Sequence, residues 1–161
     1  MRLKEKDKVT TVQSDFKLPS VLLVTKRGMV LNCELKDVPL QKRAGGGVIG
    51  ISLNNNDSVV FASQVNINDK MLVVTNKSNA KRVNLTEFAI SARNRKGLKV
   101  LPQDEIVCFV ASPVVSGEVV LQDHKDNLNF IDVSKIEVVG RMAAGKPILK
   151  NKSNKIKIKN I

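Results

Sequence analysis

The sequence predicts an all-β fold, built as an array of about three four-stranded blades. Three observations predict it. Segments that alternate apolar and polar residues recur along the chain, separated by short turns rich in Gly, Asn and Asp. These segments reappear about every 50 residues, a spacing typical of stacked β units that cannot bury their apolar faces alone. No segment has a convincing amphipathic helical pattern.

The repeat is most distinct in residues 70–99. A shift of this segment back by 50 residues, or forward by 48, aligns its apolar positions with those of residues 20–49 and 118–147. A corner of the form Arg-x-x-x-Gly recurs at Arg43 to Gly47, Arg93 to Gly97 and Arg141 to Gly145. We therefore expect one domain over residues 1–161, with repeats at about 5–53, 54–101 and 102–149 and a basic tail at 150–161.

Each repeat is expected to supply four strands in the same order. The first strands follow acidic residues and are predicted at 8–12, 59–62 and 106–110, and the second at 21–25, 71–75 and 118–122. The third strands alternate after a polar turn, so that Cys33, Val83 and Ile131 face inward. The fourth strands are predicted at 48–53, 98–101 and 146–149. Residues 150–161 are expected to form either a strand or a disordered basic arm. Their alternating Lys and Ile favour a strand that closes or extends the last unit.

The charge balance indicates a polyanionic partner. The 161 residues include 27 Lys or Arg against 15 Asp or Glu, a net charge of +12. This excess favours nucleic acid first and an anionic membrane surface second. The first residues lack a secretory signal, and the longest uncharged run, 106–117, is shorter than the roughly 20 residues of a membrane span. We expect a soluble cytoplasmic protein, associated with the nucleoid, with Cys33 and Cys108 as reduced thiols.

The aromatic content and the distribution of charge narrow the kind of nucleic acid. The chain has no Trp, no Tyr and only five Phe, whereas proteins that bind single strands usually stack bases on aromatic side chains. Contact with a duplex backbone is therefore the better expectation. Residues 70–99 contain eight Lys or Arg and one acid, while residues 100–137 are acidic. A bound polyanion should follow the middle repeat and the last corner.

No enzyme, cofactor or metal site is expected. Gly45, Gly47 and Gly50 match a dinucleotide-binding pattern, but no helix follows to hold the pyrophosphate. Residues 140–147 resemble a P-loop, yet Pro147 replaces the hydroxyl residue that would bind magnesium. The single histidine, His124, lies in a predicted exposed turn. No catalytic residue and no small-molecule substrate are predicted.

The three basic corners are the candidate site. Equivalent corners on successive units should form a spaced row along one edge, as a bent duplex requires, and their glycines allow tight turns near phosphate. The expected contacts are to phosphates and not to bases. The predicted DNA-binding residues are Lys42, Arg43, Lys77, Lys81, Arg82, Arg93, Arg95, Lys96, Lys99, Arg141 and Lys146.

Residues 72–101 resemble a blade of the C-terminal domain of bacterial type IIA topoisomerase A subunits, gyrase and topoisomerase IV. The matching features are Lys81-Arg82 after the turn, the Glu87-Phe88 pair, and the corner that begins Arg93-Asn94. Residues 41–47, QKRAGGG, are similar to the glutamine-arginine-glycine box of gyrase but depart from it at Ala44 and Gly46. This departure favours topoisomerase IV over gyrase.

The resemblance implies a β-pinwheel, a propeller-like disc whose neighbouring blades exchange strands and which bends duplex DNA around a basic rim. Three blades would form an open arc, from a shortened domain or a fragment. It also implies an accessory module that directs DNA to the catalytic core of an ATP-dependent topoisomerase. Strand cleavage in that family uses a tyrosine, and this chain has none, so we expect a binding module without enzymatic activity.

Two alternatives remain open from the sequence. A propeller of this kind could bind an acidic protein in place of DNA. A small enzyme of nucleotide chemistry would depend on the two incomplete glycine motifs.

Overall fold

The computed structural model describes residues 5, 7–14, 17–43, 45–102, 105–113, 117–123 and 126–149. The tail 150–161, with its expected strand or arm, lies outside these residues. The described chain is all-β, as predicted, with three single-turn 3-10 helices. Its elements are β1 (Ser20–Thr25), β2 (Met29–Glu34), η1 (Leu35–Asp37), β3 (Val59–Val65), β4 (Lys70–Thr75), β5 (Asn79–Asn84), η2 (Leu85–Glu87), β6 (Leu98–Lys99), β7 (Val107–Ala111), β8 (Glu118–Gln122), β9 (Leu128–Asp132), η3 (Val133–Lys135) and β10 (Lys146–Pro147).

Three β-hairpins form the framework: β1 with β2, β4 with β5, and β8 with β9. They are the second and third strands predicted for each repeat. The connecting turns need a left-handed residue, and Gly28, Ser78 and Asp126 supply it with φ of 77°, 62° and 63°. Positive φ is least costly for Gly and tolerated by small polar residues. The local turn chemistry therefore defines the hairpins.

Neighbouring repeats exchange strands. The first sheet has the order β3-β1-β2-β6, so both of its outer strands come from the following repeat. The second sheet has the order β10-β5-β4-β7 and is completed in the same way by the third repeat. The third sheet, as far as the structure describes it, contains β8 and β9. This exchange is what the resemblance to a β-pinwheel implied.

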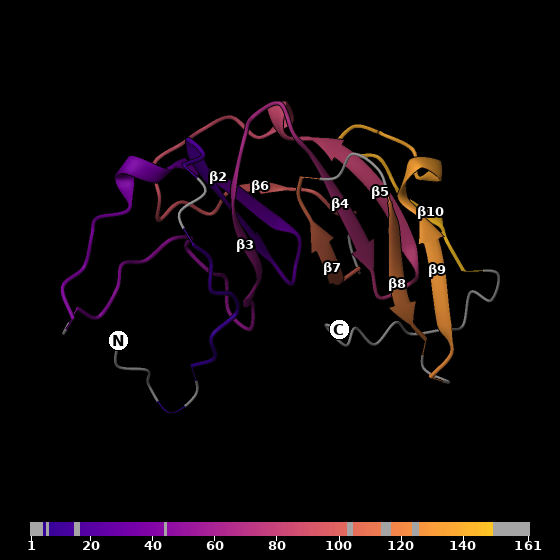
Figure 1. Cartoon of the computed structure of the whole chain (residues 1–161), viewed down its shortest axis with the longest axis horizontal. Helices are drawn as coiled ribbons and strands as arrows, with labels where there is room; N and C mark the ends of the chain where they lie inside the picture. Colours follow the sequence, from indigo (N-terminus) through magenta and orange to yellow (C-terminus); the bar gives the residue numbers. More distant parts are fainter. Residues whose placement is uncertain are drawn as a thin grey trace.

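The sheets follow one another along an arch (Figure 1). The strands β3 and β7 contact each other, so the first strands of successive repeats lie side by side at the hub. The short strands β6 and β10 lie at the opposite edge of their sheets, which makes this edge the rim. The second corner (Arg93 to Gly97) immediately precedes β6 and the third (Arg141 to Gly145) immediately precedes β10, so both lie on the rim.

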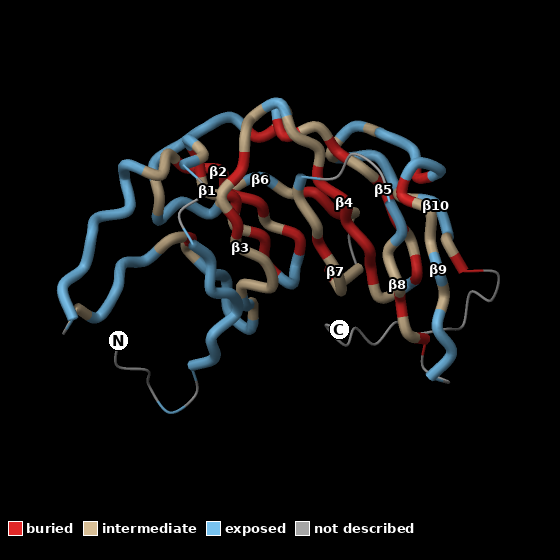
Figure 2. Tube along the Cα trace, in the orientation of Figure 1, coloured by how far each residue is buried: buried red, intermediate tan, exposed pale blue. Residues whose placement is uncertain are grey.

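The core lies between successive sheets (Figure 2). Met71 and Val73 of β4 pack towards the first hairpin in one buried cluster, while Leu72 and Val74 pack towards the third in another. Both faces of β4 are thus buried, which explains why this strand is continuously apolar. Phe88, at the end of η2, is almost fully buried in the first cluster and wedges the two sheets together.

Two predicted strands are wrong. Residues 8–12 and 48–53 form no strand, although their counterparts β3 and β6 do. Those counterparts pair with the hairpin of the preceding repeat, a partner that neither segment has within the described chain. Residues 48–53 make only an isolated bridge, between Ile51 and Arg95. The predicted strands 98–101 and 146–149 shorten to two residues each.

Candidate nucleic-acid interface

The corner glycines are required by contact with the preceding sheet. A Cβ added to Gly97, whose φ is 76°, would lie 2.3 Å from the carbonyl oxygen of Val30. A Cβ at Gly145 would lie 2.8 Å from the carbonyl oxygen of Ala80. Val30 and Ala80 occupy the same repeat position, so each corner crosses the same place on the sheet before it. The second and third corners are therefore equivalent structures on the rim.

The corner arginines bind the backbone of the preceding repeat. Arg93 donates from Nε to the carbonyl of Asp37 and from Nη1 to that of Ile49, both at 3.0 Å. Arg141 donates from Nη1 to the carbonyl of Lys99 at 3.1 Å. Since Lys99 is the repeat counterpart of Ile49, the two guanidinium groups make the same contact. Both side chains are half-buried, and part of their hydrogen-bonding capacity is used to hold repeats together.

The structure contradicts the prediction that Lys81 contacts phosphate. Lys81 is only 2% exposed, and its Nζ donates to the carbonyl oxygens of Arg141 at 2.6 Å and Ala143 at 2.8 Å. Burial lowers the pKa of Lys81 to about 8, an effect that Glu87 and Glu105 oppose. Lys81 thus holds the backbone of the last corner through two hydrogen bonds from a buried position. The period of two that places Val83 inward also places Lys81 inward, so the sequence contained the signal.

Arg82 has a comparable structural task. Its Nε donates to the carbonyl of Ile136 at 2.7 Å, and its Nη2 to that of Ser134 at 3.3 Å. The Lys81-Arg82 pair therefore anchors the third repeat to the second. Arg82 is half-buried, so only part of its guanidinium can meet a partner in solution.

Most other predicted cations are exposed on or near the rim. Lys42, Arg43, Lys77, Arg95 and Lys96 are exposed, and Lys99 is half-buried in β6. Lys146 is exposed and pairs with Glu137. The pairing of β6 with β2 places Lys99 opposite Met29, close to the β1–β2 turn. The middle corner thus brings Arg95, Lys96 and Lys99 together.

Two further exposed cations were missed. Lys26 and Arg27 lie in the β1–β2 turn, at the repeat positions of Asn76 and Lys77. From the sequence alone, Lys26 and Arg27 are typical of an ordinary solvent-exposed turn. The pairing of Met29 with Lys99 brings the turn near the middle corner, and only knowledge of the strand exchange reveals this proximity.

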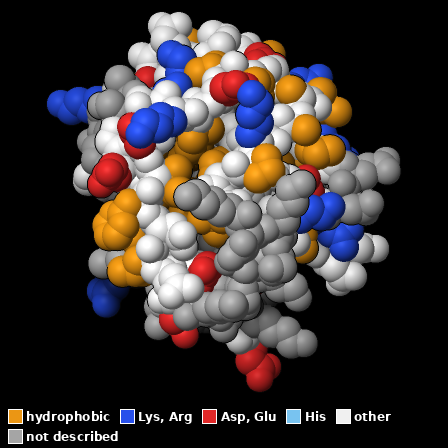
Figure 3. All heavy atoms as spheres, turned by 90° about the vertical axis from the view of Figure 1, so that its right-hand side faces the viewer, with side chains coloured by type: hydrophobic (Ala, Val, Ile, Leu, Met, Phe, Trp, Pro, Cys, Tyr) orange, Lys and Arg blue, Asp and Glu red, His pale blue; other side chains and the backbone are white. Residues whose placement is uncertain are grey.

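The acids of the third repeat are mainly turn residues. Asp123 is buried and accepts hydrogen bonds from the Asn127 backbone and side chain. Asp132 accepts from the backbone N–H and hydroxyl of Ser134, and these bonds lower the pKa of its carboxyl group. Figure 3 shows acidic and basic side chains interspersed on this end of the array.

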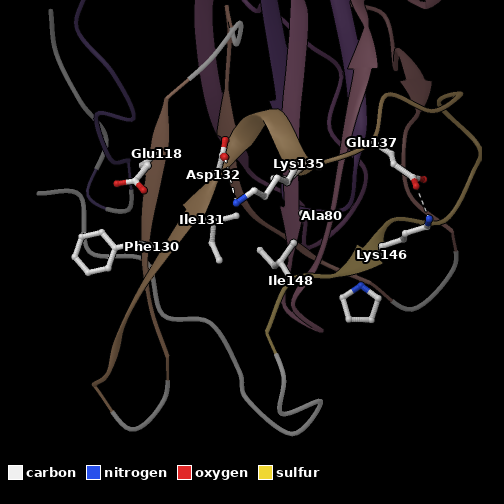
Figure 4. Close-up of a pocket in the computed structure, with 11 residues that line it drawn as sticks. Ala80, Glu118, Phe130, Ile131, Asp132, Lys135, Glu137, Lys146 and Ile148 are labelled. Carbon is white, nitrogen blue, oxygen red and sulfur yellow. Dashed lines mark hydrogen bonds and ion pairs between the residues drawn. The ribbon is translucent and has the colours of Figure 1, made fainter.

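A groove of about 430 Å³ lies between the third hairpin and β10. Ile131 and Ile148 point into it, and the ion pairs of Lys135 with Asp132 and of Lys146 with Glu137 border it (Figure 4). Its lining offers no nucleophile with an adjacent base. Among the described residues there is no group of His, Cys, Asp or Glu that could hold a metal ion. In the same part of the chain, no helix is long and apolar enough to span a membrane.

Comparison with known proteins identifies relatives over most of the chain. The family model described as DNA gyrase C-terminal domain, beta-propeller, matches residues 19–66 and 69–107. The A subunit of DNA topoisomerase 4 from Streptococcus pyogenes is 36% identical over 97 residues, which is 60% of this chain and 12% of that protein. The A subunit of DNA gyrase from Haloquadratum walsbyi is 29% identical over 144 residues, 86% of this chain and 17% of that protein.

Solved structures agree on the fold. A crystal structure of the C-terminal domain of DNA topoisomerase IV aligns with a TM-score of 0.88 at 24% identity, over 96% of this chain and 50% of that one. A structure of the DNA gyrase A C-terminal domain aligns with a TM-score of 0.84 at 23% identity, over 97% and 55%. The chain therefore spans about half of these domains. With its exchanged strands and its match to the family model, this chain belongs to the DNA gyrase C-terminal domain, beta-propeller, family.

Proposed function

We propose that this chain binds duplex DNA through the phosphates and without reading bases. The observation that carries the proposal is the set of exposed cations at the corners, above all Lys42 and Arg43 on the first and Arg95 and Lys96 on the second. Lys77, Lys99 and Lys146 extend the set. The solvent-facing parts of the half-buried guanidinium groups of Arg82, Arg93 and Arg141 add to it. Lys81 is not part of it. Flexible Lys and Arg side chains suit phosphate contact, which carries no sequence information.

The arrangement of the corners supports bending of the duplex. Because the repeats follow an arch, the corners lie on a curved outer edge. A duplex that stays in contact with successive corners must curve with them, and the phosphate contacts offset the elastic cost of doing so. We infer that the chain is the accessory module of the A subunit of a type IIA topoisomerase and delivers bent DNA to the catalytic core. A cytoplasmic place on the nucleoid follows from this role.

The catalytic steps of such an enzyme would depend on other parts of the protein. The relatives are proteins of which this chain spans about an eighth to a sixth. The sequence contains no tyrosine to serve as the nucleophile that the family uses for strand cleavage. Binding and bending are thus the proposed contribution of this chain.

A charge-matched pair of variants tests the site. Arg95→Gln with Lys96→Gln removes two exposed rim cations, while Lys36→Gln with Lys135→Gln removes two exposed lysines that already pair with acids. Binding to a 40-base-pair duplex is measured by fluorescence anisotropy across a salt series. The rim variant should bind more weakly and lower the slope of log affinity against log salt by about 0.9 for each phosphate that is no longer neutralised. The control should change little.

Two outcomes would contradict the assignment. Equal losses of affinity in both variants would mean that only the total charge matters, and no loss in the rim variant would remove these residues from the interface. Two duplexes of unrelated sequence should give the same affinities. For bending, relaxed circular DNA is nicked, bound and resealed with ligase, and a shift of the topoisomer distribution is expected. Polyglutamate that displaces DNA only at similar charge concentration would argue against a dedicated acidic protein partner.

A further inference from the structure

The two ends of the array carry exposed apolar residues whose repeat counterparts are buried. At the first end, Val38 is 39% exposed, while its counterpart Phe88 is 1% exposed. At the last end, Leu128 is 54% exposed, while its counterparts Val30 and Ala80 are 1% and 3% exposed. Val9, Val12, Ile49 and Phe130 are exposed as well, and Leu40 is 102% exposed where its internal counterparts Ile90 and Val138 are 44% and 38% exposed. Both ends thus expose surfaces that are interfaces between repeats elsewhere in the chain.

The internal interfaces show how such surfaces pair. Arg82 of β5 donates its backbone N–H to Glu137 and accepts from Val139, both at 2.9 Å, and it bridges Val138 in a parallel sense. Asn32 of β2 makes the same parallel bridge to Ile90 and accepts from Ser91. At the same position of β9 stands Phe130, and the register assigns it Leu40 as partner. The Pro39 carbonyl would accept from Phe130, a role that proline can fill.

The rim strands give a second, independent register. Val30 pairs with Leu98, and Ala80 pairs with Lys146. The same register places Leu128 opposite Val48. The space around Gly47 is consistent with this register. A Cβ at Gly47 meets nothing within 4 Å, so a strand could pack there as the preceding strands pack against Gly97 and Gly145. The first corner has the φ of 81° that suits such a contact but lacks the strand.

At the first end, the segment 7–14 already lies at the hub, where a strand of a further repeat would pair with it. Gln13 donates from Nε2 to the Ser63 hydroxyl at 3.0 Å and accepts from the Gln64 backbone at 3.2 Å. Residues 7–14 therefore lie beside β3 as β3 lies beside β7. In the internal sheets, β3 and β7 pair with the first strand of the preceding hairpin. By that register Gln13 would pair with Val120 of β8.

The groove beside the third hairpin completes the match. Arg93 binds the carbonyls of Asp37 and Ile49, whose counterparts in the third repeat are Lys135 and Pro147. Both line the 430 Å³ groove, together with Phe130 and Ile136. The register thus assigns Arg43 to this groove, where its guanidinium would become half-buried, as that of Arg93 is, and keep one edge towards solvent.

We propose that a second copy of this chain occupies both ends, the first end of each copy on the last end of the other. The occupant is a second copy because each copy carries the two complementary surfaces, matched in register at hub, hairpin and rim. Such head-to-tail contacts close a ring when the turn per copy fits, and extend into a filament when it does not. This whole arch aligns with half of one solved domain, so two arches together would have about the length of that domain.

The molar mass without DNA is the first test. Light scattering after size exclusion, over a concentration series, should give about twice the 17.7 kDa of one chain. A one-chain mass at every concentration, as expected if some other segment fills the ends, would overturn the proposal. Masses that continue to rise beyond two chains would overturn closure.

A mixing experiment tests the geometry. Leu40→Glu disables only the first end, and Leu128→Glu only the last, so each variant alone should have the mass of one chain. An equimolar mixture retains one intact contact, between the first end of the Leu128→Glu chain and the last end of the Leu40→Glu chain, and should recover the two-chain mass. Met142→Glu, at a site 56% exposed on an internal corner, should remain at two chains. Failure of the mixture to associate, with both variants folded by circular dichroism, would refute the pairing.

Discussion

The Nζ of Lys81 lies 2.6 Å from the carbonyl oxygen of Arg141, so a buried lysine of the second repeat holds the corner of the third. The side chain of Arg141 in turn binds the carbonyl of Lys99. The most basic part of the sequence thus contains cations that stabilise the array and cations that face solvent. Several consequences can be measured.

Lys81→Met should change how stability depends on pH. Burial lowers the pKa of Lys81 from 10.5 to about 8, so between these values the unfolded chain binds more protons than the folded chain. The unfolding free energy of the unmodified chain should therefore rise relative to that of Lys81→Met as the pH increases from about 8 to 10.5. Urea unfolding at a series of pH values measures the difference, with Lys77→Met as the control for removal of an exposed lysine. A difference independent of pH would contradict the assigned burial.

Gly97→Ala should destabilise far more than Gly47→Ala. Both glycines have positive φ, which costs alanine about 1 kcal/mol in each case. Only Gly97 faces a carbonyl oxygen, at 2.3 Å from the added Cβ, so the β2 backbone must also shift. We expect a loss of stability of roughly 3 kcal/mol or more at Gly97 in chemical unfolding. Equal losses at the two sites would show that the corner does not rest on β2.

Arg93→Gln should lower stability, whereas Arg95→Gln should not. Arg93 donates to two backbone carbonyls of the first repeat, and Arg95 is exposed. A partly exposed pair of such bonds is worth about 1 kcal/mol, and a free surface arginine is within about 0.5 kcal/mol of neutral. Urea midpoints at constant m value measure both. Weakened packing alone would reduce DNA binding by Arg93→Gln. A drop in affinity therefore indicates a lost phosphate contact only if it exceeds the drop expected from the measured loss of stability.

Cys108 should react with a thiol reagent before Cys33. Burial raises the pKa of both thiols, but Cys33 is almost fully buried in β2, whereas Cys108 in β7 is partly exposed. A reagent that needs an accessible thiolate should modify Cys108 slowly in the folded chain and Cys33 only on unfolding. The variant Cys108→Ser should then show almost no reaction without denaturant. Rapid labelling of that variant would mean that β2 opens locally.

The hairpins could be predicted from sequence because their signals are local. Apolar runs define the first strand of each hairpin, alternation defines the second, and a residue with positive φ defines each turn, as Gly28 and Asp126 illustrate. The strands at 8–12 and 48–53 could not be judged in this way. Whether such a segment pairs depends on a hairpin of another repeat, and β-structure stabilised by a distant partner leaves little mark on its own residues.

The exposure of the candidate site could be predicted only in part, for a similar reason. Repetition selected the corners as the candidate site, which stays a prediction, and Arg95 and Lys96 are exposed there. The same repetition could not distinguish arginines that face solvent from arginines that bind a neighbouring backbone, since both recur at fixed positions. Lys81 shows the limit of charge as a guide, because a lysine can be buried when two carbonyl oxygens accept from it.

The exchange of strands means that the unit of hydrogen bonding is offset from the unit of sequence. The hairpin of one repeat is completed by β3 and β6 of the next, and the following hairpin by β7 and β10 in the same register. An in-frame deletion or duplication of one whole period, wherever its breakpoints fall, would leave each remaining hairpin except the last with a suitable successor. Arrays of this design can therefore change length by recombination without inventing a new interface, and the length of the arc offered to a bound polymer would change in equal steps.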